Sequence, residues 1–319
     1  MLYIIVNPSS KTGLGKKCFE ELKQKLNANH ILYEVEYTDK KKGAKLAVAK
    51  FVELMKTDVD DKPVLAVLGG DGTMNGVVSE LEKIDENIFT NQKIAIEYLP
   101  TGSSNDLARS LHMKMDTDDF VRRYKDYKDG NTKPHLDYGQ LTVENGKKFN
   151  FTVSCGIGFD AAVCKEALDS PIKKALNRIH LGKLTYVAIA LKEIFTGKLT
   201  SLTLTLDEGR SHHFDKVLFA VAMIEPYEGG GIKMTPMADC HDGKFDIMVV
   251  HDIKNWQMLY LLPLAFFGAH TKAKQISFFQ STSAKIKVED PLVVHADGEY
   301  CGTVNEIEVQ CVKDGLLFI

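Results

Sequence analysis

Three glycines and a carboxylate follow one apolar run of the sequence. The run 64–68 leads into the segment GGDGT, which consists of Gly69, Gly70, Asp71, Gly72 and Thr73. Glycines let backbone N–H groups approach an anion closely, and the turn from a strand into a helix is a common phosphate-binding place. A carboxylate in such a turn repels phosphate unless it binds a cation or a proton. We therefore expect Asp71 to act through Mg²⁺ or as a base toward an attacking hydroxyl.

A purely structural role for this turn stays open, because Asp71 and Thr73 are residue types that cap helices. The two common nucleotide motifs are absent from the sequence. No lysine follows GGDGT as a P-loop requires, and Cys18 stands where the segment GLGKKC would need the third glycine of a dinucleotide fingerprint.

A second polar turn follows the apolar segment that ends near Leu99. Its small, polar or charged residues are Thr101, Gly102, Ser103, Ser104, Asn105, Asp106 and Arg109. Asp106 and Arg109 are three residues apart, so they share one face of a helix, where they could form no more than a surface ion pair. Two such turns at neighbouring strand ends predict a ligand crevice.

Strands and helices alternate over the first part of the chain. The predicted strands are Leu2–Val6, Tyr33–Tyr37, Val64–Leu68 and Ile94–Leu99. The segments 15–29 and 43–57 repeat apolar residues every three or four positions and are predicted helices. This alternation indicates a parallel sheet with helices on its faces.

Strands dominate the second part of the chain. The polar stretch 124–139 is a predicted linker, and Asn145-Gly146 between two β-prone runs predicts a hairpin. One helix is expected at Leu181–Phe195. We therefore predict a mainly antiparallel sandwich or barrel for this half.

The most apolar segment is Trp256–His270. It is interrupted by Pro263 and is shorter than the roughly 20 residues that cross a bilayer, so no transmembrane helix is expected. A core helix, or a helix plus a turn, is the first prediction for it, with a lipid-facing or membrane-touching surface as the alternative.

Length and composition indicate the number of domains and exclude some classes of function. The chain of 319 residues exceeds the size at which one core stops growing, so two domains are expected. Its net charge of -3 gives no sign of a nucleic-acid-binding surface. Six cysteines form no CxxC pair, which favours a reduced cytosolic setting, and the N-terminus lacks the features of a secretory signal.

Several motifs, in this order, resemble those of the diacylglycerol kinase catalytic family, which includes sphingosine, ceramide and related bacterial lipid kinases. The resemblance is carried by NPSS after the first strand, GGDGTMN, PTGSSNDLAR, CGIGFDAAV, LGKLTYVAIAL, ADCHDGKFD and HADGEY. These motifs span nearly the whole chain. The resemblance implies an ATP- and Mg²⁺-dependent kinase that phosphorylates a lipid hydroxyl, with diacylglycerol as the family's default acceptor.

The resemblance also implies the domain organisation. We expect an α/β N-terminal domain with a parallel sheet, similar to NAD kinase and phosphofructokinase, and a mainly antiparallel β-sandwich C-terminal domain. The nucleotide domain is expected at 1–130 with 304–319 returning to it, and the lipid and metal domain at 131–303. The nucleotide is expected in the crevice between the two domains.

Nucleotide contacts follow from the same resemblance. They are Asn7, Pro8, Ser9, Ser10, Lys11, Thr38, Gly69, Gly70, Gly72, Thr73, Asn75, Gly76 and Ser103. Three positions depart from the family pattern. Lys11 replaces the glycine of the NPxSG turn, Gly76 replaces the glutamate that usually follows GGDGTxN, and His241 replaces an aspartate before the DG turn.

A metal site and a base are implied as well. Mg²⁺ would be bound by Asp242 and Asp239 with the backbone oxygen of Lys244. Glu299 of the DGE segment is the expected general base, because a lipid alcohol is scarcely ionised at neutral pH. Asp71 is the alternative base, since sphingosine-type relatives are usually described with the GGDGT aspartate in that role.

The expected substrate contacts are Asn105, Asp106, Arg109 and Asp160, of which Asp160 lies in the family's headgroup region. The expected partner is a lipid at a membrane surface, reached by reversible binding of a cytoplasmic protein to the inner membrane face. No nucleic acid is expected as a partner, and a homodimer stays open.

Two other functions compete with this prediction. NAD kinase or a sugar-kinase-like phosphotransferase would act on a soluble substrate, but the NDLAR and DGKFD segments argue against both. A non-catalytic lipid-binding homologue is the second rival, suggested by Gly76.

Overall fold

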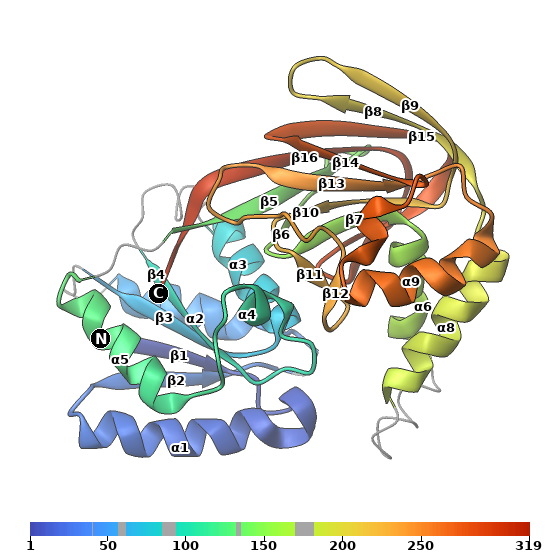
Figure 1. Cartoon of the computed structure of the whole chain (residues 1–319). Helices are drawn as coiled ribbons and strands as arrows, with labels where there is room; N and C mark the ends of the chain where they lie inside the picture. The colour runs from blue at the N-terminus through green and yellow to red at the C-terminus, as the bar shows by residue number, and fades with distance from the viewer. Residues whose placement is uncertain (40, 57–61, 85–93, 132–134, 170–181) are drawn as a thin grey trace. The chain divides into compact units, whose positions relative to one another are not determined.

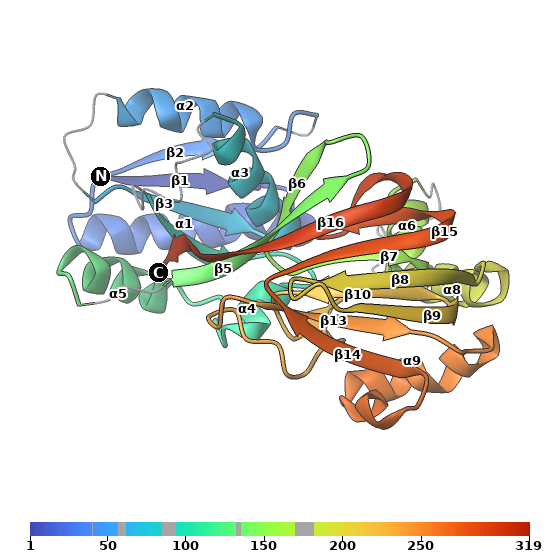
Figure 2. The same ribbon diagram turned by 90° about the horizontal axis from the view of Figure 1, so that it is seen from above.

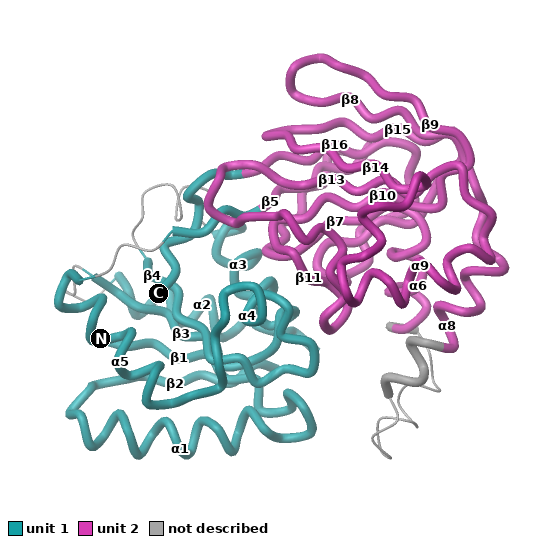
Figure 3. Tube along the Cα trace, viewed as in Figure 1, with its two compact units in different colours: residues 1–138, 312–319 teal, residues 139–311 magenta. Residues whose placement is uncertain are grey.

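The computed structural model describes residues 1–39, 41–56, 62–84, 94–131, 135–169 and 182–319. The chain forms two compact units (Figure 3). Unit 1 comprises Met1–Tyr138 and Val312–Ile319, and unit 2 comprises Gly139–Cys311. The chain therefore passes between the units after Tyr138 and after Cys311, where the sequence suggested 130 and 303.

Unit 1 is built on a parallel sheet. Its strands are β1 (Leu2–Val6), β2 (Tyr33–Tyr37), β3 (Val64–Gly69), β4 (Ala95–Pro100) and the last residues of β16 (Glu299–Phe318). They lie in the order β16, β4, β3, β1, β2, and every neighbouring pair is parallel. The helices of this unit are η1 (Ser10–Gly13), α1 (Leu14–Ala28), α2 (Lys45–Met55), α3 (Asp71–Ile84), α4 (Asp106–Ser110) and α5 (Thr117–Lys128).

Helices cover both faces of this sheet. Figure 2 shows α2 and α3 on one side of the strands and α1 and α5 on the other. On the second side, Phe19 and Leu22 of α1 and Phe120 of α5 pack with Ile4 and Leu68 in one buried cluster. Strands buried on both faces are apolar along their whole length, which is why the sequence revealed them as continuous apolar runs.

Unit 2 consists mainly of antiparallel strands (Figure 1). Its strands are β5 (His135–Val143), β6 (Lys148–Phe151), β7 (Ser154–Gly158), β8 (Thr200–Leu206), β9 (Ser211–Val217), β10 (Phe219–Met223), β11 (Tyr227–Glu228), β12 (Ile232–Lys233), β13 (Phe245–Val250), β14 (Ile276–Ser281), β15 (Ser283–Ala296) and most of β16. The order along the sheet is β14, β13, β10, β7, β15, β16, with β8 pairing both β15 and β9. The helices are α6 (Phe159–Asp169), α8 (Gly182–Thr196), η2 (Asn255–Gln257), α9 (Met258–Phe266) and η3 (Ala269–Lys272).

The predicted fold class is confirmed: a parallel α/β region comes first and an antiparallel β-rich region follows. The hairpin predicted at Asn145-Gly146 joins β5 to β6. The predicted linker is wrong in detail, because α5 continues to Lys128 and β5 begins at His135. Of the predicted helix Leu181–Phe195, the first residue lies outside the described residues, and the rest belongs to α8.

Cys18, Cys155, Cys240 and Cys301 are free thiols. Among the helices that the structure describes, none combines the length and the apolar character that crossing a bilayer requires.

Gly76 lies inside α3, and its replacement tests the packing around that helix. A Cβ added there would meet only the Cβ of Ala44, at 3.9 Å. Because glycine in a helix interior costs about 1 kcal/mol relative to alanine, Gly76→Ala is expected to raise the free energy of unfolding by about that amount in urea. Gly69→Ala is the control that should lower it, since its Cβ would lie 2.4 Å from the Cβ of Thr73. A loss of stability in Gly76→Ala would contradict this description of α3.

Candidate functional site

The carboxyl ends of the parallel strands lie at one edge of the unit 1 sheet, because the register aligns their last residues. The alignment continues into the loops. The N–H of Asn7 donates to the carbonyl of Leu68 at 2.8 Å, and that of Thr101 to the carbonyl of Gly69 at 2.7 Å. Thr38 follows β2 at the same edge. The structure therefore gathers the predicted nucleotide residues of four separate segments.

The loops after β1 and β3 lie on either side of the point where the order of strands in the sheet reverses. β1 lies between β2 and β3, and the chain covers one face with α1 before it covers the other with α2 and α3. Open α/β sheets bind ligands outside such a switch point. A hydrogen bond joins the two loops there, from Nδ2 of Asn7 to Oγ1 of Thr73 at 3.0 Å.

The GGDGT and PTGSS turns touch backbone to backbone. A Cβ on Gly102 would lie 2.4 Å from the Cα of Gly70, and a Cβ on Gly15 would lie 2.1 Å from the carbonyl oxygen of Asn7. Only glycine allows these approaches. Gly102 and Gly15 were not among the predicted nucleotide contacts. The sequence offers no signal that separates them from the other glycines.

The predicted residues of the first loop divide into two groups. Ser10 is buried, and its Oγ lies 2.7 Å from Oγ1 of Thr101 and 3.0 Å from the carbonyl oxygen of Asn7, so it ties the loops together. Ser9 and Lys11 are exposed at the loop surface. Lys11 has a φ of 41°, a left-handed conformation that favours glycine, which is the residue that the family pattern places there.

Asp71 caps a helix, but not the helix to which it belongs. Its Oδ2 accepts the N–H of Asp106 at 2.9 Å and its Oδ1 accepts that of Leu107 at 3.3 Å, both in the first turn of α4. Asp106 in turn pairs with Arg109, as the sequence suggested. Burial first, and then the charges of Asp71 and Asp106, raise the pKa of Tyr98 well above its ordinary value. Negative charge is therefore concentrated beside the glycine turns.

The remaining predicted residues of this unit surround the two turns. Ser103 is exposed just after β4. Asn105 adopts a left-handed φ of 51°, and its Nδ2 donates to the carbonyl of Gly102 at 3.2 Å, so it shapes the second turn. Asn75 is buried on α3, where its Oδ1 accepts the hydroxyl of Ser79 at 3.0 Å.

In unit 2, the DGE segment forms the turn between β15 and β16. The carboxylate of Asp297 accepts the N–H groups of Thr152, Val153 and Ser154 at 2.8 to 2.9 Å and the hydroxyl of Thr152 at 3.0 Å. Asp297 therefore anchors the turn to the start of β7. Glu299, the predicted base, begins β16 and is exposed.

A buried histidine links this turn to the predicted substrate residue Asp160. Nε2 of His295 lies 3.1 Å from Oδ2 of Asp160 and 3.4 Å from Oε1 of Glu228, and Nδ1 accepts the N–H of Gly298 at 3.1 Å. Burial lowers the pKa of His295, but the neighbouring carboxylates outweigh burial and raise it to about 9. The Gly298 N–H nevertheless occupies the nitrogen that a second proton would need. Since both ring nitrogens have directional partners, we assign the neutral ring with its proton on Nε2.

His295 and Glu228 were not predicted as site residues. His295 lies in the motif HADGEY that the sequence singled out, but neither spacing nor composition revealed that His295 and Glu228 meet Asp160. Gly156 allows this meeting, because a Cβ there would lie 1.8 Å from Oδ2 of Asp160.

The predicted metal residues lie on the turn before β13. Oδ1 of Asp239 accepts a backbone N–H of the same turn at 3.0 Å, and Oδ1 of Asp242 accepts the N–H of Lys244 at 2.9 Å. Gln280 donates to Oδ2 of Asp242 at 2.7 Å. Burial, and then the charge of Asp242, raise the pKa of Asp246 to about 6. Carboxylates and a backbone carbonyl on one turn with excess negative charge suit a hard cation such as Mg²⁺.

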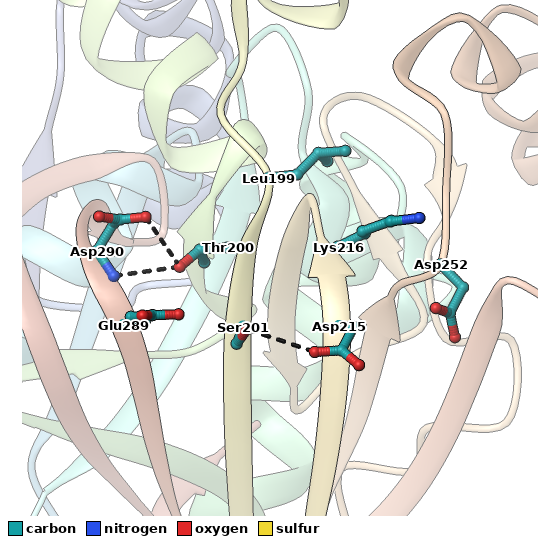
Figure 4. A pocket seen from close by; sticks show the side chains of 8 residues that line it. All are labelled: Leu199, Thr200, Ser201, Asp215, Lys216, Asp252, Glu289 and Asp290. Atoms are coloured by element: carbon teal, nitrogen blue, oxygen red, sulfur yellow. Dashed lines mark hydrogen bonds between the residues drawn. The ribbon is translucent and has the colours of Figure 1, made fainter.

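A hollow of about 380 Å³ elsewhere in unit 2 contains none of the predicted residues (Figure 4). It is lined by Leu199, Thr200, Ser201, Asp215, Lys216, Asp252, Glu289 and Asp290. Four of these side chains are carboxylates and one is a lysine, so the hollow repels polyphosphate. It is therefore not a candidate nucleotide site.

Two family models match the chain. The model described as the diacylglycerol kinase catalytic domain matches residues 1–134. The model described as the YegS C-terminal NAD kinase beta sandwich-like domain matches residues 154–316.

The matches to curated relatives and to a solved structure cover nearly the whole chain. A Bacillus subtilis protein named "Putative lipid kinase YtlR" is 28% identical over 302 residues, which are 94% of this chain and 94% of that protein. The diacylglycerol kinase of Bacillus subtilis is 25% identical over 94% of this chain and 89% of its own. The crystal structure of a diacylglycerol kinase from Bacillus anthracis str. Sterne, 19% identical, covers 100% of this chain and 96% of its own with a TM-score of 0.69, a likeness that shows the fold.

Proposed function

Because the chain belongs to the diacylglycerol kinase catalytic-domain family, a family of lipid kinases, we propose that it transfers the γ-phosphoryl group of ATP to a lipid hydroxyl with the help of Mg²⁺. Diacylglycerol is the proposed acceptor, since relatives of similar length carry that name. The observation that carries the nucleotide half of the proposal is the contact between Gly70 and Gly102 at the switch point of the parallel sheet.

The phosphates of ATP would be held by backbone N–H groups at this edge. Helix α3 begins at Asp71, directly after the glycines, and its positive dipole end favours an anion there. Ser9, Lys11 and Ser103 are exposed around the same edge and would complete the phosphate contacts.

Carboxylates would hold the cation. Mg²⁺, when bound, would neutralise charge on the phosphoryl oxygens. Asp71, whose carboxylate accepts two N–H groups of α4, would hold that cation or a water bound to it. The turn of Asp239, Asp242 and the Lys244 carbonyl would hold a structural cation in unit 2.

Glu299 would take the proton from the acceptor hydroxyl. A general base must lie within hydrogen-bond reach of that proton, and an exposed carboxylate on an anchored turn can be approached by a substrate. Asp297 holds the turn and the His295 ring supports it through Gly298, so Glu299 would be presented in a fixed position.

Asp71→Asn is expected to lower the rate of transfer by about 100-fold or more while it costs no more than about 1 kcal/mol of stability. The remaining oxygen of Asn can still accept one N–H of α4, but the charge that would attract Mg²⁺ is lost. The rate is measured with labelled ATP and the stability by urea denaturation.

A matched control for this variant is Asp116→Asn. Asp116 also caps a helix, since its Oδ1 accepts the N–H groups of Asp118 and Asp119 at 2.9 and 3.1 Å. The control should lose similar stability and keep its rate. If Asp71→Asn kept the wild-type rate as well, Asp71 would be a helix cap alone.

An acceptor panel tests the proposed reaction class. The protein would be given labelled ATP with diacylglycerol, ceramide, sphingosine, NAD or fructose 6-phosphate, each with Mg²⁺ and with EDTA. Label is expected in a lipid, in the Mg²⁺ arm only. Label in NAD or the sugar phosphate would replace the proposal with a soluble-substrate kinase, and tight lipid binding without any transfer would favour a non-catalytic homologue.

A further inference from the structure

Helix α9 is apolar on the side that faces away from unit 2. Met258, Leu261 and Ala265 are buried and attach the helix to the unit. Large apolar side chains are exposed on its other side and on the residues that flank it, and we name them the α9 patch: Trp256 (54%) of η2, Leu259 (44%), Tyr260 (44%), Leu264 (39%) and Phe266 (49%) of α9, and Phe267 (82%) directly after it. A surface helix of a globular domain normally has polar residues on its outer face. The core helix expected from the sequence is therefore buried on one face only.

The α9 patch continues toward the end of α8. Nδ2 of Asn255 donates to the carbonyl of Gly197 at 2.9 Å, which joins η2 to the residues just after α8. α8 and α9 lie side by side in Figure 1. Phe195, near the end of α8, is 64% exposed. Several large apolar side chains exposed on and beside one helix are typical of a binding surface.

Lysines, and no acidic residues, accompany the patch along the chain. The segment 254–275 contains Lys254, Lys272 and Lys274 and neither Asp nor Glu, although the whole chain has a net charge of -3. All three lysines are exposed. Asp252, just before the segment, bonds to His251 at 2.9 Å. The patch therefore combines apolar side chains with local positive charge.

We propose that the α9 patch inserts into the interface of an anionic lipid bilayer. This inference rests on the proposed function, for which it names the surface that the enzyme would touch while it acts. Trp and Tyr place a ring in the acyl boundary and a polar atom at the headgroups, and each nearby lysine adds attraction to anionic lipid.

Charge argues against a second copy of the chain as the occupant. A two-fold symmetric interface would bring this surface against itself, so Lys254, Lys272 and Lys274 of both copies would approach each other without carboxylates from the same segment. An anionic membrane instead complements all three lysines.

The test uses the single tryptophan of the chain, which lies in the patch as Trp256. Its fluorescence would be recorded with vesicles of phosphatidylcholine alone and of phosphatidylcholine with phosphatidylglycerol. With the anionic vesicles we expect a blue shift and quenching by brominated acyl chains. Replacing Lys254, Lys272 and Lys274 together with Gln should remove the preference for anionic vesicles.

Phe267→Ser should weaken binding to anionic vesicles by at least about tenfold, because it removes a large apolar side chain from the interface. Leu32→Ser is the matched control: Leu32 is 76% exposed in unit 1 and lies outside the patch, so its loss should leave binding unchanged. Both variants should have the same midpoint of urea unfolding as the wild type.

Kinase assays separate this inference from the proposed function. Phe267→Ser should phosphorylate diacylglycerol in detergent micelles at the wild-type rate and diacylglycerol in vesicles more slowly. If no lipid were phosphorylated in either form, the proposed function would fail while the fluorescence result stood. Absence of a blue shift with anionic vesicles would overturn the inference. So would a wild-type dimer that Phe267→Ser converts to a monomer, because the patch would then join two copies.

Discussion

Glu299→Gln is expected to lower the rate of phosphoryl transfer by about 10²- to 10⁴-fold, the usual contribution of a positioned general base. The amide has nearly the same shape as the carboxylate but cannot accept the proton of the acceptor hydroxyl. Glu299 is exposed at the start of β16, so the free energy of unfolding should change by less than about 0.5 kcal/mol. Initial rates and urea denaturation of the same preparation measure both effects.

Glu308→Gln is the matched control, because Glu308 is also an exposed carboxylate of β16, with Lys285 as its partner at 3.1 Å. It should keep the wild-type rate. If Glu299→Gln also kept it, the role of base would pass to Asp71, the alternative that the sequence left open.

Asp297→Ala is expected to lower the free energy of unfolding by about 3 to 5 kcal/mol, an unusually large effect for one surface turn. The alanine would remove the acceptor of three backbone N–H groups and one hydroxyl at the start of β7. Asp297 is half-buried, and hydrogen bonds to a carboxylate are among the stronger ones. Urea denaturation followed by circular dichroism measures the loss.

Two further variants serve as comparisons for the stability loss of Asp297→Ala. Asp297→Asn keeps one acceptor oxygen and should lose less stability than Asp297→Ala. Asp290→Ala removes an exposed carboxylate of the same strand pair, which accepts a hydrogen bond from the hydroxyl of Thr200, and should lose less than about 1 kcal/mol. If Asp297→Ala lost no more than Asp290→Ala, the anchoring role of Asp297 would be wrong.

Strands β1 and β3 could be predicted because burial on both faces makes them continuous apolar runs bounded by polar turns. β2, with the sequence YEVEY, is only partly buried. β1 and β2 have the predicted limits, and β3 and β4 differ by one residue at their ends. The positions of the two glycine turns followed directly, since each turn comes at the end of one of these strands.

Helix α5 could not be found from apolar spacing, because its buried residues stand among many charges. Phe120, Val121 and Tyr124 are buried, whereas more than half of the 12 residues are Asp, Lys or Arg. Its start was signalled by Asp116, which caps the first turn. The predicted linker 124–139 overlaps the end of this helix, because the Gly and Pro residues that mark the linker lie only just beyond Lys128.

The contacts that define the site are long-range, and local patterns do not specify them. Asp71 caps α4 from the end of a different strand, and His295 reaches Asp160 from β15. The sequence identified several of these residues through motifs but assigned no partner to any of them. The sequence left helix capping by Asp71 open, but the identity of the capped helix, the anchoring by Asp297 and the support from the His295 ring became visible only with the fold.

The most direct test of the proposed function is transfer of label from ATP to diacylglycerol in mixed micelles with Mg²⁺, by wild type, Glu299→Gln and Glu308→Gln side by side. The proposal predicts labelled phosphatidic acid from the wild type and Glu308→Gln at similar rates, and at least about 100-fold less from Glu299→Gln. Absence of labelled phosphatidic acid with the folded wild-type protein would contradict diacylglycerol kinase activity.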